Sequence, residues 1–504
     1  MMNSAVTASV ANHQDDVIEL SGAMIVPRRV SVAAVLQQAL LLCVLGTVPV
    51  LFGAVQAWVW PVYVLAMYAA FLLLVWSGLD ADWVPAGKGW RVAVGVFLAV
   101  TGMACVPLPI GLLAVVSPAR FDLLRQTGAL TGDATLWATL SYAPLQSLAW
   151  WAWLLGLALL FGVLSAQFAE PGFLKIALWV LFGVAVLEAL YGILQALLPN
   201  MGVLWVSYLE AGMGDARGTY INRNHFAGFM EMLLPLLLGF SLSRVHWGGR
   251  LKWKVLLHSE HLHQHVLMVL ALVVMALALL FSKSRGGITG ALLGMFVFFM
   301  FLRGGARQMP KGVWILCGLF FGLILFYGLR IGFDPIFDRF LALEQGNSRL
   351  DYWRDSLPII AAHPLGIGLA AFETVFPVYD TSAVSDRSMA VYLHNDVLQL
   401  LVEAGWIGFA ALAGAFAVFL GKMFRRIRRM DAACDPRRFF LAAGAYSGLV
   451  AMTVHSFFDF NLQIPANAVY FVMLMAIVKV LSAQSYSQTM GGAERVVTGA
   501  ACGR

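Results

Sequence analysis

The chain has 504 residues and a formal net charge of +6; 61% of its residues are hydrophobic and only 12% are charged. Soluble domains carry about 25% charged residues and about half apolar ones, so this composition excludes an ordinary soluble protein. Apolar runs recur along nearly the whole chain, and a run of about 18 or more such residues is typical of a membrane-spanning helix. We therefore predict an all-α polytopic membrane protein.

The apolar runs predict about twelve membrane-spanning helices. The first six are Val32 to Ala54, Ala57 to Trp76, Val92 to Val116, Leu148 to Phe168, Ile176 to Leu198 and Phe226 to Leu242. The second six are Val266 to Phe281, Ile288 to Leu302, Val313 to Leu329, Val397 to Leu420, Phe439 to Val454 and Ala466 to Leu481. Residues 1–31 and 484–504 then form tails on a transmembrane domain at 32–483.

Basic residues set the predicted orientation. Alternating sides from a cytoplasmic N-terminus places most lysines and arginines inside, including the cluster "KMFRRIRRMDAACDPRR", as the positive-inside rule expects. Both termini are then cytoplasmic, and residues 330–396 form one large outer loop between the ninth and tenth spans. Because orientation accounts for the positive charge, we expect no nucleic-acid partner.

Two arginines are expected at the outer membrane surface. "SKSRGG" (Ser282 to Gly287) joins two apolar runs shorter than the roughly 20 residues of a full span. We expect this hairpin tip to dip into the interface and hold Arg285 there, with its glycines supplying a tight turn. Arg217, in "GDARGTYINRNHF", lies on the same side. Converging guanidinium groups suit a diphosphate, whose oxygens match their planar fork of donors; alternatively, each arginine only anchors a helix end.

A polar group opens the tenth predicted span, "LHNDVLQLLVEAGWIG". Asn395 or Asp396 can cap the free N–H groups at the helix start. Asn395, Gln399 and Glu403 follow at i, i+4 and i+8, so we expect this stripe to face protein or a water-filled cavity. His394 is the residue best suited to act as a general base there. The alternative is an interfacial histidine bonded to a loop carbonyl.

The outer loop is expected to contain a helix in "NSRLDYWRDSLPIIAAHPLGIG". Ser348 and Asp351 resemble a capping pair. Leucine, tryptophan and isoleucine then recur at helical spacing, at Leu350, Trp353, Leu357 and Ile360, and predict one apolar face. Such a helix could lie along the membrane surface and roof a cavity.

Taken together, the ordered motifs resemble the O-antigen ligase/polymerase superfamily of polytopic glycan transferases. They are "RGTYINRNHFAG" (Arg217 to Gly228), "SKSRGG", "NSRLDYW…HPLGIGLAAFE", "LHNDVLQLLVEAGWIG" and "HSFFDFNLQIP". These motifs cover about residues 210–465, and the first five spans match only in general character. The resemblance implies a bacterial inner-membrane protein, with the large loop at 330–396 periplasmic and catalytic.

The resemblance also implies a reaction and its participants. A glycan would move from undecaprenyl diphosphate to an acceptor hydroxyl, with lipid A–core the favoured acceptor, among membrane lipids and without cofactor or metal. Arg217 and Arg285 would grip the diphosphate, and His394 would activate the acceptor, which implies inversion at the sugar carbon. Further candidates for substrate binding are Arg223, Arg349 and Asn395.

Alternatives remain at this point. A polymerase would extend another lipid-linked repeat unit with the same donor chemistry, and a protein-glycosylating transferase is a further possibility. A transporter or lipid flippase is kept open by Glu188, an acid inside the fifth span. The histidines of "HSEHLHQH" have ligand-like spacing, but a solvated helix face is favoured over a metal site.

Overall fold

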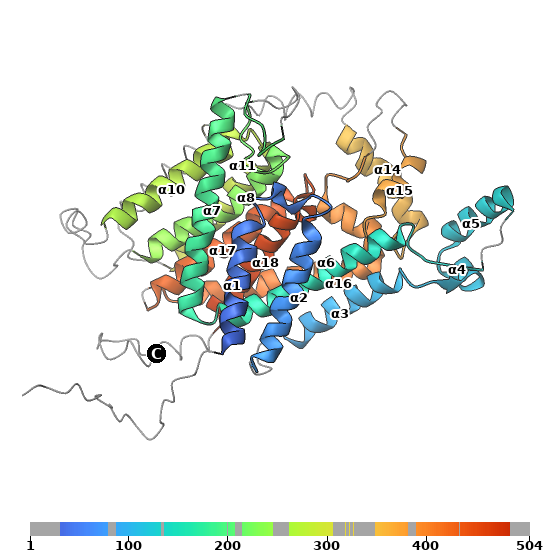
Figure 1. Cartoon of the computed structure of the whole chain (residues 1–504), viewed down its shortest axis with the longest axis horizontal. Helices are drawn as coiled ribbons and strands as arrows, with labels where there is room; N and C mark the ends of the chain where they lie inside the picture. The colour runs from blue at the N-terminus through green and yellow to red at the C-terminus, as the bar shows by residue number, and fades with distance from the viewer. Residues whose placement is uncertain are drawn as a thin grey trace, which may run out of the picture.

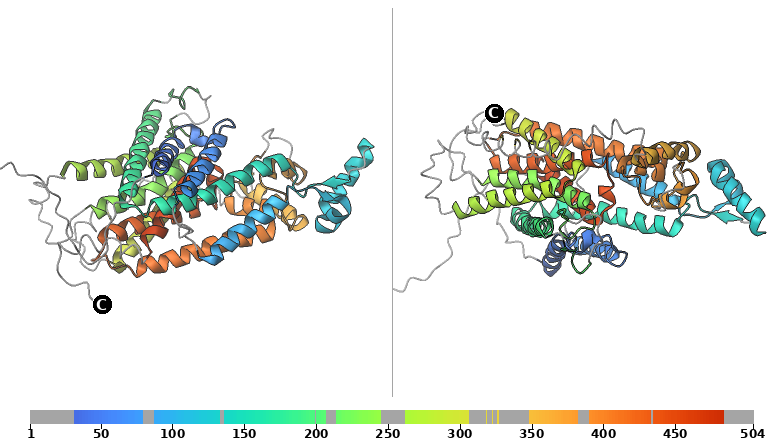
Figure 2. Two further views of the ribbon diagram at one scale, coloured as in Figure 1. Left: turned by 60° about the horizontal axis from the view of Figure 1, so that its bottom comes forward. Right: turned by 90° about the horizontal axis from the view of Figure 1, so that it is seen from above.

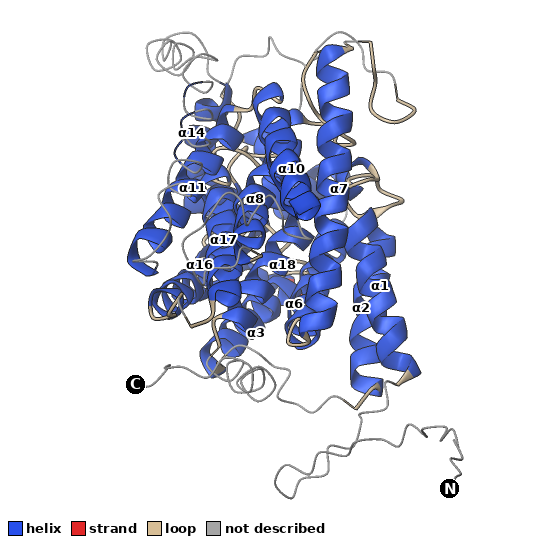
Figure 3. Cartoon of the chain, turned by 90° about the vertical axis from the view of Figure 1, so that its left-hand side faces the viewer, coloured by secondary structure: helices blue, strands red, loops and turns tan. Residues whose placement is uncertain are grey.

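A computed structural model of the chain describes residues 31–78, 87–132, 136–198, 200–206, 214–244, 262–305, 318, 322, 326, 348–381, 390–432 and 434–483. Within these residues the fold is almost wholly helical, with fifteen α-helices and one two-stranded antiparallel sheet. Most of the helices form one elongated bundle (Figure 1). Figure 3 shows the bundle turned by 90° about the vertical axis, and in this view too almost all of the described chain is helical.

Five apolar helices come from the N-terminal part of the chain. They are α1 (Val32–Thr47), α2 (Trp60–Trp76), α3 (Lys88–Met103), α6 (Pro144–Gln167) and α7 (Pro171–Leu197). Proline occupies the first turn of α2, α6 and α7, where its missing N–H costs nothing and its fixed φ favours a helix start. Four of the five predicted N-terminal spans therefore correspond to a single helix each, apart from their ends.

The third predicted span, Val92 to Val116, is wrong as a single helix. Helix α3 ends at Met103, and β1 (Leu108–Pro109) follows, which pairs antiparallel with β2 (Trp137–Ala138). Pro107 and Pro109 explain the break, because proline lacks the N–H that would continue the helix. Between the two strands the chain forms α4 (Ile110–Val116) and α5 (Pro118–Thr131), which project from one end of the bundle (Figure 2).

The centre of the bundle is built from the C-terminal part of the chain. Its helices are α8 (Arg223–Ser243), α10 (Leu262–Phe281), α11 (Arg285–Gly305), α16 (Asp396–Arg428), α17 (Pro436–His455) and α18 (Pro465–Leu481). In the apolar stretch of α8, 94% of the residues are buried, so this helix is surrounded by protein. Helices α8 and α17 approach so closely that a side chain at Gly239 or Gly444 would collide with the backbone of the other helix.

Several of these helices can cross a membrane. Six are long and apolar enough, namely α6, α7, α8, α10, α11 and α16, and three shorter ones are apolar, namely α1, α2 and α18. The chain is therefore a multi-pass membrane protein. The ninth predicted span, Val313 to Leu329, falls almost entirely outside the described residues, and twelve spans stay a prediction.

The outer-loop region contains the expected helix, α14 (Ser348–Ala362), with α15 (Phe372–Val375) and the 3-10 turn η4 (Phe376–Val378) beside it. The predicted apolar face is wrong in part, because Leu350 and Leu357 are exposed while Asp355 and Ile359 are buried. The buried face of α14 packs on a small core formed mostly by loop residues such as Phe372, together with Ala143 and with Val402 of α16. This contact with the loop decides which face is buried.

Helix α16 is interrupted near its start. Gly405 has φ 66° and ψ −179°, outside the helical region. Gly366 of the loop lies against this point with φ 87°, and a side chain on either glycine would collide with the other segment. Trp406 N donates to the carbonyl of Pro364 at 3.0 Å. The first nine residues of α16, 396–404, are thereby tied to the loop.

Candidate active site

His394 stands immediately before α16 in an unusual backbone conformation. Its φ is 51°, a left-handed value that is uncommon for a residue other than glycine and that often marks functional positions. The next residue, Asn395, caps α16, since its side-chain oxygen accepts from Leu398 N at 3.0 Å. Asp396 N then donates to the carbonyl of Ser456 at 2.9 Å. These bonds fix His394 against the turn that follows α17.

That turn supplies a direct partner for His394. The imidazole Nδ1 lies 3.1 Å from Oδ1 of Asp459, whose side chain is 1% exposed, whereas the His394 side chain is 28% exposed. Phe460 packs edge-on against the imidazole with ring centroids 4.8 Å apart. The histidine is thus held on one side by a buried carboxylate and remains reachable from solvent on another.

Asp459 is kept as an anion by its surroundings. Burial by itself would raise the pKa of this carboxyl, but the His394 hydrogen bond and the nearby His225 and Arg349 hold it well below its usual range. Its oxygens also accept from Asn224 Nδ2 at 2.7 Å and from Phe460 N at 2.9 Å. A carboxylate can only accept, so His394 Nδ1 carries the hydrogen, and in the neutral imidazole Nε2 is then the nitrogen with the lone pair.

Arg349 reaches the same turn from α14. Its Nη1 donates to the carbonyl of Phe458 at 2.8 Å, and its Nη2 lies 3.6 Å from Asp459 Oδ2. The Arg349 side chain is 36% exposed. The sequence-based expectation of a substrate contact for Arg349 is not tested by this arrangement, which shows the residue bracing Asp459.

A second acidic residue, Asp215, gathers three basic side chains. Arg223 Nη1 lies 2.6 Å from one carboxylate oxygen, and Lys283 Nζ lies 2.9 Å from the other. Arg217 Nη2 is 4.0 Å away, and its Nη1 donates to the carbonyl of Ile221 at 3.2 Å. Three cations around one anion leave a net positive charge here, which suits an anionic ligand.

The segment of Arg217 lies beside the segment of Arg285. Ala216 N donates to the carbonyl of Phe281 at 3.0 Å, and Arg285 is the first residue of α11 four positions later. The two segments therefore lie side by side. Whether the two guanidinium groups share a diphosphate stays a prediction.

Two expectations about "SKSRGG" are wrong. Helices α10 and α11 have 20 and 21 residues, long enough to span, because α10 begins before Val266 and α11 begins at Arg285. Gly286 and Gly287 are helical instead of forming a turn. A side chain at Gly286 would collide with the ring of His455, and one at Gly287 with Ala227, so these glycines allow α11 to approach α17 and α8.

Glu188 and Gln195 of α7 anchor the segment after Asp215. Both Glu188 carboxylate oxygens accept from Thr219, from its N–H at 2.8 Å and from its hydroxyl at 2.7 Å. The Gln195 side chain accepts from Arg217 N at 3.1 Å and donates to the carbonyl of Gly218 at 2.9 Å. Glu188, for which the sequence offered no partner, thus fixes the backbone next to Arg217.

The polar stripe of α16 faces protein, as predicted. Gln399 Nε2 donates to Glu403 Oε1 at 3.0 Å, and Gln399 Oε1 accepts from Leu393 N at 3.1 Å. Glu403 Oε2 accepts from Ala370 N at 2.9 Å. Both side chains are buried. Their bonds hold the loop at Ala370, and the chain at Leu393 just before His394, against α16.

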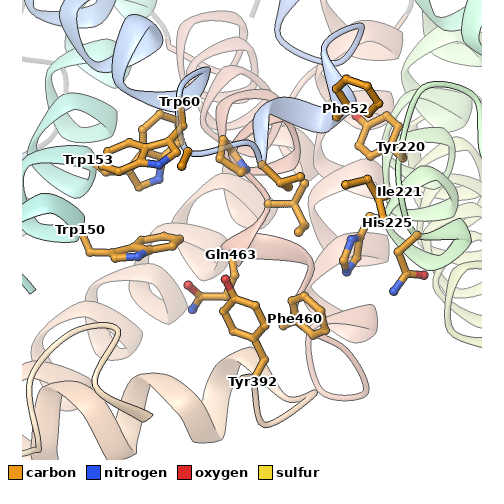
Figure 4. Close-up of a pocket in the computed structure, with 15 residues that line it drawn as sticks. Phe52, Trp60, Trp150, Trp153, Tyr220, Ile221, His225, Tyr392, Phe460 and Gln463 are labelled. Atoms are coloured by element: carbon orange, nitrogen blue, oxygen red, sulfur yellow. The ribbon is translucent and has the colours of Figure 1, made fainter. Parts of the chain in front are cut away.

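A cavity of about 400 Å³ opens beside this site. Figure 4 shows aromatic side chains around it, with Trp60, Trp150 and Trp153 on one side and Tyr392 and Phe460 on another. Tyr392 stacks on Phe460 with ring centroids 4.3 Å apart. Burial raises the pKa of Tyr392 to about 12, with Glu403 adding to the rise, so its hydroxyl stays protonated.

The polar residues of the cavity come from the segments already described. They are Asn222, His225 and Gln463. His225 is buried, and its Nε2 has no hydrogen-bond partner among the described residues. The part of the chain that the structure describes contains no group of three histidine, cysteine, aspartate or glutamate residues that could hold a metal. Independence from metal stays a prediction.

Several residues of the site were not predicted from the sequence. Asp459 lies in the motif "HSFFDFNLQIP", which was singled out without a role for its aspartate. Asp215, Asn224 and Lys283 also lie inside quoted motifs. For Asp215 and Asn224 the signal was an acidic or amide residue beside conspicuous basic ones. Asn224 and Lys283, however, pair with Asp459 and Asp215, which are far from them in the chain.

Comparison with known proteins agrees with the motifs. Residues 270–413 match the family model described as O-Antigen ligase, which confirms the resemblance. This region runs from α10 into α16 and includes Arg285, Arg349 and His394, whereas Arg217 and Asp459 lie outside it. No curated protein matches the chain.

Proposed function

We propose that this chain, whose residues 270–413 form an O-antigen ligase domain, transfers a glycan from undecaprenyl diphosphate to a hydroxyl of lipid A–core. The observation that carries the proposal is the hydrogen bond between His394 and the buried Asp459. It provides a general base that is oriented and partly exposed. The base is also close to the basic segment, which comprises Arg217 and Arg223 together with Lys283 and Arg285.

The His394–Asp459 pair supports proton removal from the acceptor. Because Asp459 accepts the Nδ1 hydrogen, Nε2 can take the proton of an acceptor hydroxyl as its oxygen attacks the anomeric carbon. The carboxylate stabilises the imidazolium that forms. This is the division of labour between histidine and aspartate in hydrolase triads, applied here to a sugar hydroxyl.

The basic segment supports departure of the diphosphate. As the bond from the anomeric carbon to the phosphate oxygen breaks, negative charge grows on the diphosphate, and fixed cations stabilise it. Arg217, Arg285 and Lys283 are the candidates for this role. One direct displacement with attack opposite the leaving group inverts the configuration of the sugar carbon.

The distribution of charge supports a reaction on the outer face of the inner membrane. Helix α16 has His394 at its start and Arg425, Arg426 and Arg428 in its last turn. Helix α11 likewise begins at Arg285 and has Arg303 in its last turn. Arginine clusters favour the cytoplasmic side, which supports the proposal of a periplasmic site and cytoplasmic termini.

A transporter gains little support, because its main argument from the sequence was Glu188. That carboxylate is engaged by Thr219 and positions the Arg217 segment. The unusual polar residues gather at one end of the bundle, which suits a one-sided enzyme.

The test compares a deletion strain with strains expressing wild type or His394→Ala. We expect the deletion and His394→Ala strains to retain long glycans on undecaprenyl diphosphate, with lipid A–core left bare. Single repeat units without long chains would instead identify a polymerase. Normal glycan on lipid A–core in the deletion strain would refute a transferase role.

A further inference from the structure

The aromatic cavity borders both halves of the proposed site. It is lined by Tyr220, Ile221 and Asn222, and Ile221 accepts the hydrogen bond from Arg217. It is also lined by Phe460, against which His394 packs. A group in this cavity would therefore lie next to residues that contact Arg217 and next to a residue that contacts the general base.

The lining of the cavity matches a sugar better than a hydrocarbon chain. Its walls are aromatic, and they also carry amide, imidazole and phenol groups at Asn222, His225, Tyr392 and Gln463. The rings can stack on the C–H face of a pyranose, while the polar groups bond to its hydroxyls. An isoprenoid would leave the buried polar groups without partners, which is costly.

The size of the cavity agrees with this ligand. About 400 Å³ is in the range of small-molecule pockets, about 300–1,000 Å³, and can hold a sugar unit but not a chain of eleven isoprenes. His225 adds a second indication, because its ring borders the cavity (Figure 4) while its buried Nε2 lacks a partner among the described residues.

We infer that this cavity is the binding site for the donor sugar that is linked directly to the diphosphate. In a displacement reaction the anomeric carbon must lie between the leaving group and the attacking oxygen. The cavity borders the proposed diphosphate segment at Ile221 and the His394 imidazole at Phe460, so a sugar in it is next to both groups that the displacement needs. The inference rests on the proposed function and adds the residues that recognise the glycan.

Trp150 is the most suitable residue for a test, since it lines the cavity and is only partly buried. Trp150→Leu keeps an apolar side chain but removes the aromatic face, and Trp150→Phe keeps a smaller one. Gln463→Leu, a second variant, removes polar contacts at nearly constant size. Trp179→Leu is the matched control, because Trp179 packs on Phe240 away from the cavity.

The experiment measures the binding of three probes to purified full-length protein in nanodiscs. The probes are undecaprenyl diphosphate carrying one repeat unit, undecaprenyl diphosphate without sugar, and free core oligosaccharide. For Trp150→Leu we expect the Kd of the sugar-carrying donor to rise about tenfold, with the other two unchanged. Trp150→Phe should recover most of the affinity, and Gln463→Leu should weaken the same probe.

Three results would overturn the inference. If the Kd of the sugar-free carrier rose equally, the cavity would bind the isoprenoid diphosphate instead of the sugar. If only the Kd of core oligosaccharide rose, the cavity would bind the acceptor. If the Kd of every probe stayed unchanged in both variants, the cavity would not be a binding site for the donor sugar. Failure of the proposed function looks different: wild type would transfer no glycan to lipid A–core while sugar binding still depended on Trp150.

Discussion

Replacing Asp459 with asparagine tests the proposed base most directly. The change keeps the shape of the side chain, and its amide oxygen, in the place of Oδ1, can still accept from Phe460 N–H. What it removes is the negative charge 3.1 Å from His394 Nδ1. We expect a large loss of turnover with little loss of substrate binding.

The size of the effect follows from the geometry. An imidazolium spreads its charge over the ring, so its distance from the carboxylate is about 4 Å, and their attraction at an effective dielectric of about 20 is about 4 kcal/mol. That energy corresponds to a loss in kcat on the order of 10³-fold. Arg349 adds to it, since its cation 3.6 Å from Asp459 would then oppose formation of the imidazolium.

The assay is glycan transfer by reconstituted protein over a range of pH. Because the imidazolium loses its carboxylate, the acid limb of kcat/KM should move to lower pH, which a purely structural loss would not cause. Asp355→Asn is the control, because that buried carboxylate bonds to Thr381 N at 2.8 Å and not to His394. Asp459→Asn with wild-type kcat and an unmoved acid limb would refute the assigned role of the pair.

Three further substitutions test other parts of the site. Arg285→Gln should lower kcat/KM about tenfold to a hundredfold by removing charge-assisted hydrogen bonds, whereas Arg303→Gln at the far end of α11 should not; equal losses in an activity assay would contradict the diphosphate role. Asn395→Ala should lower the free energy of unfolding by about 1 kcal/mol through loss of the cap. If turnover were lost while thermal stability stayed unchanged, Asn395 would instead bind the substrate. Gly366→Ala should destabilise the protein by about 1–3 kcal/mol, because its φ of 87° is strained for alanine, whereas Gly414→Ala, in open space, should be neutral in thermal unfolding.

Most of the bundle could be predicted from the sequence, because an apolar run of about 20 residues seldom forms anything but a membrane-spanning helix. The expectation failed where composition and backbone chemistry disagree, as between Val92 and Val116, a mostly apolar stretch that contains Pro107 and Pro109. It also failed at Gly286, where a glycine pair typical of a turn serves instead to let two helices meet. Composition alone does not separate these two uses of glycine.

The site was only half visible in the sequence. His394 could be singled out because a histidine at the mouth of an apolar helix is conspicuous, and Arg217 and Arg285 because outer basic residues oppose the orientation rule. Asp459 is 65 positions from His394, and Lys283 is paired with Asp215 although α8 and α10 lie between them in the chain. Such pairings depend on how the helices pack, and no local pattern reports them.

The break at Gly405 divides α16 into a short part next to His394 and a long part that can cross the membrane. The part of α16 after the break, Trp406 to Arg428, has 23 residues and a length of about 35 Å, close to the roughly 30 Å of bilayer hydrocarbon. Asp396 to Ala404 stand beyond it, bonded to the loop. A bilayer of another thickness should tilt the long part about Gly405 and leave His394 in place. We therefore expect turnover to vary little between vesicles of short and long acyl chains, so the enzyme would tolerate local changes in the membrane around it.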